Sequence, residues 1–221
     1  MINDSILQRL VVDELNWEPS VNAAHIGVVV KNGVVTLTGF VDSYAARAAA
    51  EDAAGRVKGV AAIAQEIEVR LPNAQKRADD EIAERALRVL TWDVAVPDEG
   101  IHVKVSHGVV TLSGTVEHYF QRTAAENAIK RLSGVKFISN QIGVVPKVVV
   151  PVTPGSIRNQ IDAALRRRAD IEANNINIVV DQGKVTLMGT THSWLEKSTI
   201  NDAVWGAPGV VEVEDRMTVR S

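Results

Sequence analysis

The sequence contains no cysteine and few aromatic residues, which make up 4% of its 221 residues. Without cysteine the chain has no disulfide, no thiolate metal site and no thiol nucleophile. No apolar run approaches the ~20 residues that a membrane-spanning helix needs. The first residues lack the basic flank and apolar core of a secretory signal. We therefore expect a cytoplasmic protein, or a periplasmic one if a leader has been removed from the chain.

The charge is nearly balanced along the whole chain. The sequence has 24 Lys and Arg against 27 Asp and Glu, a net charge of −3. Residues 1–75, 76–150 and 151–221 carry 6, 10 and 8 basic residues and 9 acidic residues each, so their balances are 6 − 9 = −3, 10 − 9 = +1 and 8 − 9 = −1. No third has the basic excess that nucleic-acid binding requires, and we expect no nucleic-acid partner.

One segment occurs three times at a constant spacing. Gly33–Gly39 returns as Gly108–Gly114 and as Gly183–Gly189, and both 108 − 33 and 183 − 108 equal 75. Such a repeat indicates one small module present in three copies. A residue that the scaffold requires should occur in every copy. A residue that serves a site in one copy should depart from the pattern.

Each copy has the sequence pattern of a helix, two strands, a second helix and a third strand. In the first copy, apolar residues at helical spacing begin near Asp4 and end before Pro19. Two alternating segments follow, separated by Asn32 and Gly33, a pair typical of tight hairpins. A small-residue helix over 43–56 then leads to a third alternating segment. This strand–helix–strand crossover predicts that the third strand runs parallel to the second.

The predicted fold class is α+β, with three tandem αββαβ modules. Each module should be a three-stranded mixed sheet that carries both helices on one face. We expect the modules near residues 3–70, 78–145 and 154–220.

Two sets of repeated residues have specific expected positions. A glycine in each copy should end the second strand; these are Gly39, Gly114 and Gly189. A leucine in the same strand should be buried beneath the helices; these are Leu37, Leu112 and Leu187.

The repeated core reads I-x-V-x-V-x-x-G-x-V-T-L-x-G and is followed by a helix and a Gly-Val strand. This pattern resembles the BON domain (bacterial osmotic-shock and nodulation domain), in an OsmY-like arrangement with three copies. The matching residues are Ile26 to Gly39 with Gly59-Val60, Ile101 to Gly114 with Gly134-Val135, and Ile176 to Gly189 with Gly209-Val210.

The resemblance implies a non-enzymatic module associated with phospholipid or envelope surfaces and with osmotic stress, and it brings no catalytic residue. The residues themselves agree with an absence of enzyme chemistry. No HExxH motif, nucleophile elbow or phosphate loop occurs in the sequence. We expect no catalytic site, no metal and no cofactor.

The few aromatic residues include one repeated position at the start of the second helix. Tyr44, Tyr119 and Trp194 share this position, and a basic residue follows three positions later in each copy. An aromatic ring with a cation one turn away is typical of an interfacial membrane anchor. The same position would also suit a ring that seals the edge of the core, and both interpretations stay open. The candidate binding residues here are Tyr119, Phe120, Arg122, Trp194 and Lys197.

The third copy differs from the others at the end of its first helix. Trp17 and Trp92 match each other, whereas the third copy has Arg166, Arg167 and Arg168 in this region. The three arginines are candidates for contact with an anionic surface. Alternatively, they complement the dipole at a helix C-terminus.

Two hypotheses on function therefore stand. In the first, the protein docks through these residues on an anionic phospholipid surface or an envelope partner. In the second, it is a structural adaptor whose modules bind protein partners or other copies, with no lipid involved.

Overall fold

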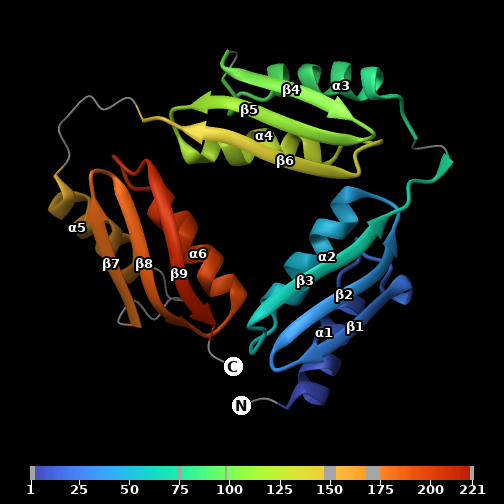
Figure 1. The fold of residues 1–221 in the computed structure, drawn as a ribbon, viewed down its shortest axis with the longest axis horizontal. Coiled ribbons are helices and arrows are strands. Elements are labelled where there is room, and N and C mark those ends of the chain that lie inside the picture. The colour runs from blue at the N-terminus through green and yellow to red at the C-terminus, as the bar shows by residue number, and fades with distance from the viewer. Residues whose placement is uncertain (1–2, 74–75, 98, 147–152, 168–174, 220–221) are drawn as a thin grey trace.

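The computed structural model describes residues 3–73, 76–97, 99–146, 153–167 and 175–219. These residues form three modules, each with one sheet of three strands (Figure 1). Module 1 contains α1 (Asp4–Trp17), the short 3-10 helix η1 (Ala23–His25), β1 (Ile26–Lys31), β2 (Val34–Val41), α2 (Tyr44–Arg56) and β3 (Ala62–Val69). Module 2 contains α3 (Asp79–Trp92), β4 (Ile101–Ser106), β5 (Val109–Val116), α4 (Tyr119–Lys130) and β6 (Phe137–Val144). Module 3 contains α5 (Pro154–Arg166), β7 (Ile176–Asp181), β8 (Lys184–Thr191), α6 (Trp194–Trp205) and β9 (Glu212–Val219).

The predicted fold class and sheet topology are confirmed. In every module the first strand pairs antiparallel with the second, and the second pairs parallel with the third. The register repeats as well, since Val28 faces Leu37, Val103 faces Leu112 and Ile178 faces Leu187. The three sheets are separate from one another.

The hairpin between the first two strands has the backbone that its sequence predicts. Asn32 and Gly33 both have positive φ, at 52° and 76°, as a two-residue type I′ turn requires. The carboxylate of Asp4 accepts hydrogen bonds from the N–H groups of both residues, at 2.8 and 3.2 Å. Asp79 binds the equivalent turn of module 2, whereas Pro154 occupies this place in module 3. The first helix is thereby tied to the hairpin in two modules.

The prediction that a glycine ends the second strand was wrong. Gly39 lies inside β2, which continues to Val41. Its φ is +106°, and a Cβ built on it would lie 2.0 Å from the carbonyl oxygen of His25. The glycine is therefore required by a close approach of the chain that enters β1. Gly114 and Gly189 occupy the same position in β5 and β8.

The core of each module lies between its sheet and its two helices. The first helix buries one stripe of side chains, Leu7, Val11 and Leu15 in module 1. The leucines of the second strand are fully buried, which confirms their predicted side of the sheet; they are Leu37, Leu112 and Leu187.

The modules form a closed triangle (Figure 1). The third strands β3, β6 and β9 are innermost and follow the triangle in one rotational sense. Helices α2 and α6 contact each other although they come from the first and last modules. The three modules are thus related by an approximate threefold axis, which we call the ring axis. Under this relation, equivalent positions lie at similar heights along the ring axis.

Candidate functional site

The repeated aromatic position joins each module to the next. The Tyr44 ring meets the ring of Phe137 in module 2 edge to face, with centroids 6.2 Å apart. Tyr119 stacks on Trp205 of module 3, with centroids 4.8 Å apart and planes 7° apart. These two contacts are equivalent in direction, because in both cases the start of a second helix meets the following module.

The third contact closes the ring. Trp194 of module 3 lies against Gly55 of module 1, and a Cβ on this glycine would be 3.2 Å from the Trp194 Cδ1. The repeat position of Gly55 is occupied by Lys130 in module 2 and by Trp205 in module 3. Because module 1 has glycine there, the Trp194 ring meets no side chain at this position. Lys130 instead forms an ion pair with Asp52 of module 1, at 3.7 Å.

Burial at these contacts affects the two tyrosines. Desolvation raises the pKa of the Tyr119 phenol, and the nearby carboxylate of Asp202 in module 3 adds to the shift. Burial likewise raises the pKa of Tyr44, with a further contribution from Glu126 of module 2. Both phenols are therefore neutral at physiological pH, which suits a packed contact between modules.

The basic residue one turn after each aromatic also has protein partners. Arg122 lies 5.9 Å from the centre of the Tyr119 ring and donates a hydrogen bond to the carbonyl of Asn140. Lys197 lies 5.3 Å from the Trp194 ring and donates to the carbonyl of Met217 at 2.7 Å. The predicted pairing of aromatic and cation therefore occurs, and it lies at the ring contacts. Contact of these residues with lipid stays a prediction.

Phe120 has a more exposed environment than its neighbour Tyr119. Its side chain is 58% exposed and stacks on His118, with ring centroids 5.6 Å apart. Both residues line a recess of about 420 Å³ that also includes Trp205. Phe120 remains available to a partner at this boundary between modules 2 and 3.

The arginines of the third copy end helix α5. Arg166 and Arg167 are exposed, and Arg168 lies outside the described residues. Trp17 and Trp92 occupy the equivalent place in modules 1 and 2, at the ends of α1 and α3. Their side chains are 84% and 82% exposed, and the neighbouring Val94 is fully exposed. We call this set the helix-end patch: Trp17, Trp92, Val94, Arg166 and Arg167.

The exposure of the two tryptophans could have been predicted from the sequence. The buried stripe of α1 ends at Leu15, and Trp17 follows two residues later, about 200° further around the helix. Leu90 and Trp92 have the same relation in α3. Both are tryptophans, the largest apolar residue type, and both side chains point away from the core.

The described residues hold no candidate metal group and no candidate membrane-spanning helix. Among them, no group of three or more His, Asp or Glu side chains is close enough to hold a metal ion. Nor does any described helix have the length and apolar character to cross a bilayer.

The family of the chain is shown by comparison with known proteins. The BON domain model matches residues 3–70, 78–146 and 155–221. The chain therefore belongs to the BON domain family, with three copies of the domain. It is 31% identical over 145 residues to osmotically-inducible protein Y of Escherichia coli K12, across 64% of this chain and 72% of that protein. It is also 33% identical over 116 residues to an uncharacterized protein in the gshII 5′ region of Anaplasma centrale, across 51% and 77% of the two chains.

Two solved structures show a weak likeness to this chain. Two structures of CdsD, a structural protein of the type III secretion system of Chlamydia trachomatis, align at a TM-score of 0.27 with 11% and 12% identity. They cover 97% and 100% of this chain, and the alignments span 92% and 100% of the CdsD chains. A TM-score of this size supports no conclusion about function.

Proposed function

We propose that this protein is a non-enzymatic, stress-related BON protein that docks on anionic phospholipid surfaces through its helix-end patch. The observation that carries the proposal is the exposure of Trp17 and Trp92, at 84% and 82%, at one repeat position. An indole ring combines an apolar body with an N–H donor, and it therefore favours the boundary between headgroups and acyl chains.

Module 3 contributes positive charge to the helix-end patch, whereas modules 1 and 2 contribute indole rings. Arg166 and Arg167 are exposed at the end of α5, where a guanidinium group can pair with a lipid phosphate. An approximate threefold relation would put the three helix ends at similar heights along the ring axis. A flat bilayer could then engage all of them at once, and linked weak contacts would add up to a stronger one.

The size of the attraction should be modest. Each basic side chain near an anionic surface contributes about 1 kcal/mol, and the attraction is screened within a Debye length. The net charge of −3 opposes binding. Each indole adds about 1–2 kcal/mol if about half of its surface is buried. We therefore expect weak binding that depends on salt.

The family supports this function. The resemblance to BON domains implies association with phospholipid or envelope surfaces. The E. coli relative is named as osmotically inducible, which favours a role under osmotic stress for this chain as well.

Sedimentation with phosphatidylglycerol vesicles tests the proposal. The protein should bind at low salt, more weakly at about 0.15 M salt, and not to neutral phosphatidylcholine vesicles. Replacing Arg166 and Arg167 by serine should weaken binding by about 2 kcal/mol, or roughly thirtyfold. The triple variant that also replaces Arg168 tests the whole arginine segment.

Two matched controls separate the patch from general effects of charge and apolar surface. The double variant Lys31→Ser/Lys104→Ser removes the same charge from exposed strand positions. The double variant Trp17→Ser/Trp92→Ser is compared with Val29→Ser/Val179→Ser, since these valines are 59% and 47% exposed on strands β1 and β7. If the control variants lose as much binding as the patch variants, the helix-end patch is not the docking site.

An adaptor function is the alternative, and one observation favours it. Strands β1, β4 and β7 each pair on one side only, so their outer edges are available for another strand. If the intact protein fails to sediment with anionic vesicles at low salt, the adaptor function is preferred.

A further inference from the structure

We propose that the cleft between modules 1 and 2 binds a phosphoryl oxyanion. The cleft has a volume of about 590 Å³ and is lined by the end of β3, the start of module 2 and the approach to β6. We call it the basic cleft, after its cations Arg70, Lys76, Arg77 and Lys136. Its volume is within the range of small-molecule sites, about 300–1,000 Å³.

The composition of the basic cleft is specific to this one boundary. Lys136 stands where module 1 has Ala61 and module 3 has Val211. The side chain of Lys136 packs over Gly108, because a Cβ on that glycine would lie 3.2 Å from the Lys136 Cγ. A residue needed for the shared fold would recur at 75-residue spacing. The lysine does not recur, so the fold does not account for it.

The residues that line the basic cleft have a net positive charge, although the net charge of the whole protein is negative. Its four Lys and Arg side chains face two carboxylates, Glu68 and Asp79, which leaves 4 − 2 = +2. The net charge of the whole chain is −3. Positive charge concentrated in a concave surface attracts anions more strongly than the same charge on a convex one.

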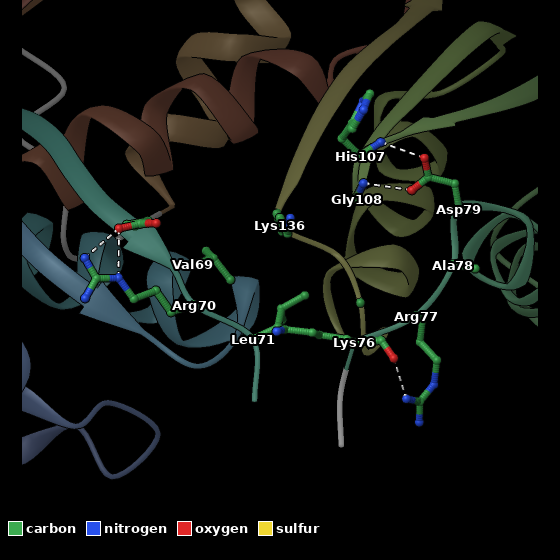
Figure 2. A pocket seen from close by; sticks show the side chains of 12 residues that line it. Val69, Arg70, Leu71, Lys76, Arg77, Ala78, Asp79, His107, Gly108 and Lys136 are labelled. Atoms are coloured by element: carbon green, nitrogen blue, oxygen red, sulfur yellow. Dashed lines mark hydrogen bonds and ion pairs between the residues drawn. The ribbon is translucent and has the colours of Figure 1, made fainter. Parts of the chain in front are cut away.

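Both carboxylates of the cleft already have partners. Glu68 forms an ion pair with Arg70 at 2.8 Å, and the Arg70 guanidinium also lies 4.6 Å from the centre of the Phe40 ring. Asp79 accepts hydrogen bonds from the backbone N–H groups of His107 and Gly108, at 2.7 and 2.9 Å, as Figure 2 shows. The charge of Lys136 also helps to lower the pKa of Asp79, but no ion pair joins the two side chains.

The other cations of the cleft differ in whether they already have an acidic partner. The Arg77 guanidinium turns away from the cleft in Figure 2, donates to the carbonyl of Lys76 at 2.8 Å and pairs with Glu81. Among the described residues, no acidic side chain forms an ion pair with the ammonium group of Lys76 or Lys136. Lys136 lies between the strand end that carries Arg70 and the turn that carries Gly108 (Figure 2). Cations from two modules thus border one recess.

The cations that line the basic cleft indicate which chemical group would bind there. Two ammonium groups with a third, partly engaged cation match a group with several anionic oxygens, and a phosphoryl group provides these. Lys76 lies in the segment that joins β3 of module 1 to α3, so a ligand held by Lys76 and Lys136 would tie this segment to module 2. Binding should therefore stabilise the ring contact between Tyr44 and Phe137, which neighbours Lys136.

The phosphoryl group could belong to a soluble phosphate ester or to a lipid headgroup, and two arms of one experiment distinguish these sources. In the first arm, inorganic pyrophosphate is titrated into the full chain by calorimetry in chloride buffer, and the thermal midpoint is recorded with and without it. In the second arm, the same proteins are sedimented with phosphatidylglycerol vesicles.

The test variant is Lys76→Ser/Lys136→Ser, and its matched control is Lys31→Ser/Lys104→Ser, which removes equal charge from exposed strand positions. We expect the test variant to lose roughly tenfold or more in affinity for pyrophosphate, together with the thermal shift. The control should retain both. Lys136→Arg should restore binding in a chain that keeps Lys76.

The outcomes separate this site from the helix-end patch. If only vesicle binding falls in the test variant, the cleft holds a lipid headgroup and the proposal stands with that source. Trp17→Ser/Trp92→Ser should leave pyrophosphate binding intact, whatever it does to vesicle binding. If the test variant and its control behave alike in both arms, the basic cleft is no anion site and the proposal is overturned.

Discussion

Tyr119 stacks face to face on Trp205 across the boundary between modules 2 and 3, with ring centroids 4.8 Å apart. The same helix start provides Tyr44 at the boundary between modules 1 and 2, and Trp194 at the boundary that closes the ring. One repeat position therefore performs one structural task three times, with a different partner each time. The partner is Phe137 for Tyr44, Trp205 for Tyr119 and Gly55 for Trp194.

The stacked pair should contribute energy beyond the burial of each ring. We expect Tyr119→Ala and Trp205→Ala to be coupled by about 0.5–1.5 kcal/mol in a double-mutant cycle of unfolding free energy. Tyr44→Ala with Trp205→Ala serves as the control pair, because these side chains lie at different boundaries. If the Tyr119 and Trp205 effects simply add, the stack contributes nothing of its own.

The closing contact depends on the absence of a side chain at Gly55. Gly55→Leu should displace the Trp194 ring, since even a Cβ would lie 3.2 Å from its Cδ1. In a chain where Trp194 is the only tryptophan, its emission should shift to longer wavelength as water reaches the ring. Gly155→Leu is the control, because a Cβ there meets nothing within 4 Å. An unshifted emission spectrum in Gly55→Leu would mean that Trp194 does not rest on this helix.

The repeated leucines test the core. Leu37→Ala, Leu112→Ala and Leu187→Ala each remove a fully buried side chain and should destabilise their modules by about 2–5 kcal/mol. Val29→Ala, at a position that is 59% exposed, should change stability far less. Chemical denaturation of all four variants provides the comparison. Equal losses in the leucine and valine variants would contradict the assigned face of the sheet.

The hairpin carboxylate of module 2 should make stability depend on pH. The N–H groups of Gly108 and His107 lower the pKa of Asp79 below its ordinary value. Because the folded pKa is the lower one, this contribution is fully present above the ordinary carboxyl pKa and is lost as pH falls through the folded pKa. Asp79→Asn should therefore lose less stability than the wild type over this acidic range.

The measurement for Asp79 is the thermal midpoint as a function of pH below neutrality. Glu18 and Glu214 also have lowered pKa values, through hydrogen bonds from Ser20 and Arg216 respectively, so some acid sensitivity remains in any Asp79 variant. Glu99→Gln removes an equal charge from the surface of module 2 and is the control. Identical pH profiles for Asp79→Asn and Glu99→Gln would show that the turn contact has no effect.

Most of the fold within a module could be predicted from the sequence, because it depends on local periodicity and turn chemistry. Asn32 and Gly33 specify the hairpin, and the alternation around Leu37 specifies the buried face of β2. The prediction for Gly39 was wrong, because a glycine that allows another segment to approach closely cannot be told in sequence from a glycine that ends a strand. The exposure of Trp17 could be predicted, because Trp17 lies on the opposite side of the helix from the buried Leu15.

The arrangement of the modules could not be predicted in this way. The contact of Trp194 with Gly55 joins module 3 to module 1, and no periodicity links these two residues. The basic cleft has the same origin, because Arg70 and Lys136 belong to different modules and meet only when the ring forms. The sequence does mark one residue of the cleft, since Lys136 departs from Ala61 and Val211 at its equivalent positions.

The most direct test of the docking proposal measures which tryptophans enter the membrane. Four variants, each retaining only Trp17, Trp92, Trp194 or Trp205, are mixed with phosphatidylglycerol vesicles that contain brominated acyl chains. We expect bromine to quench the fluorescence of Trp17 and Trp92, and to leave Trp194 and Trp205, which lie at the ring contacts, unquenched. Quenching of Trp194 without quenching of Trp17 or Trp92 would contradict docking through the helix-end patch and would place the lipid contact at the repeated aromatic position.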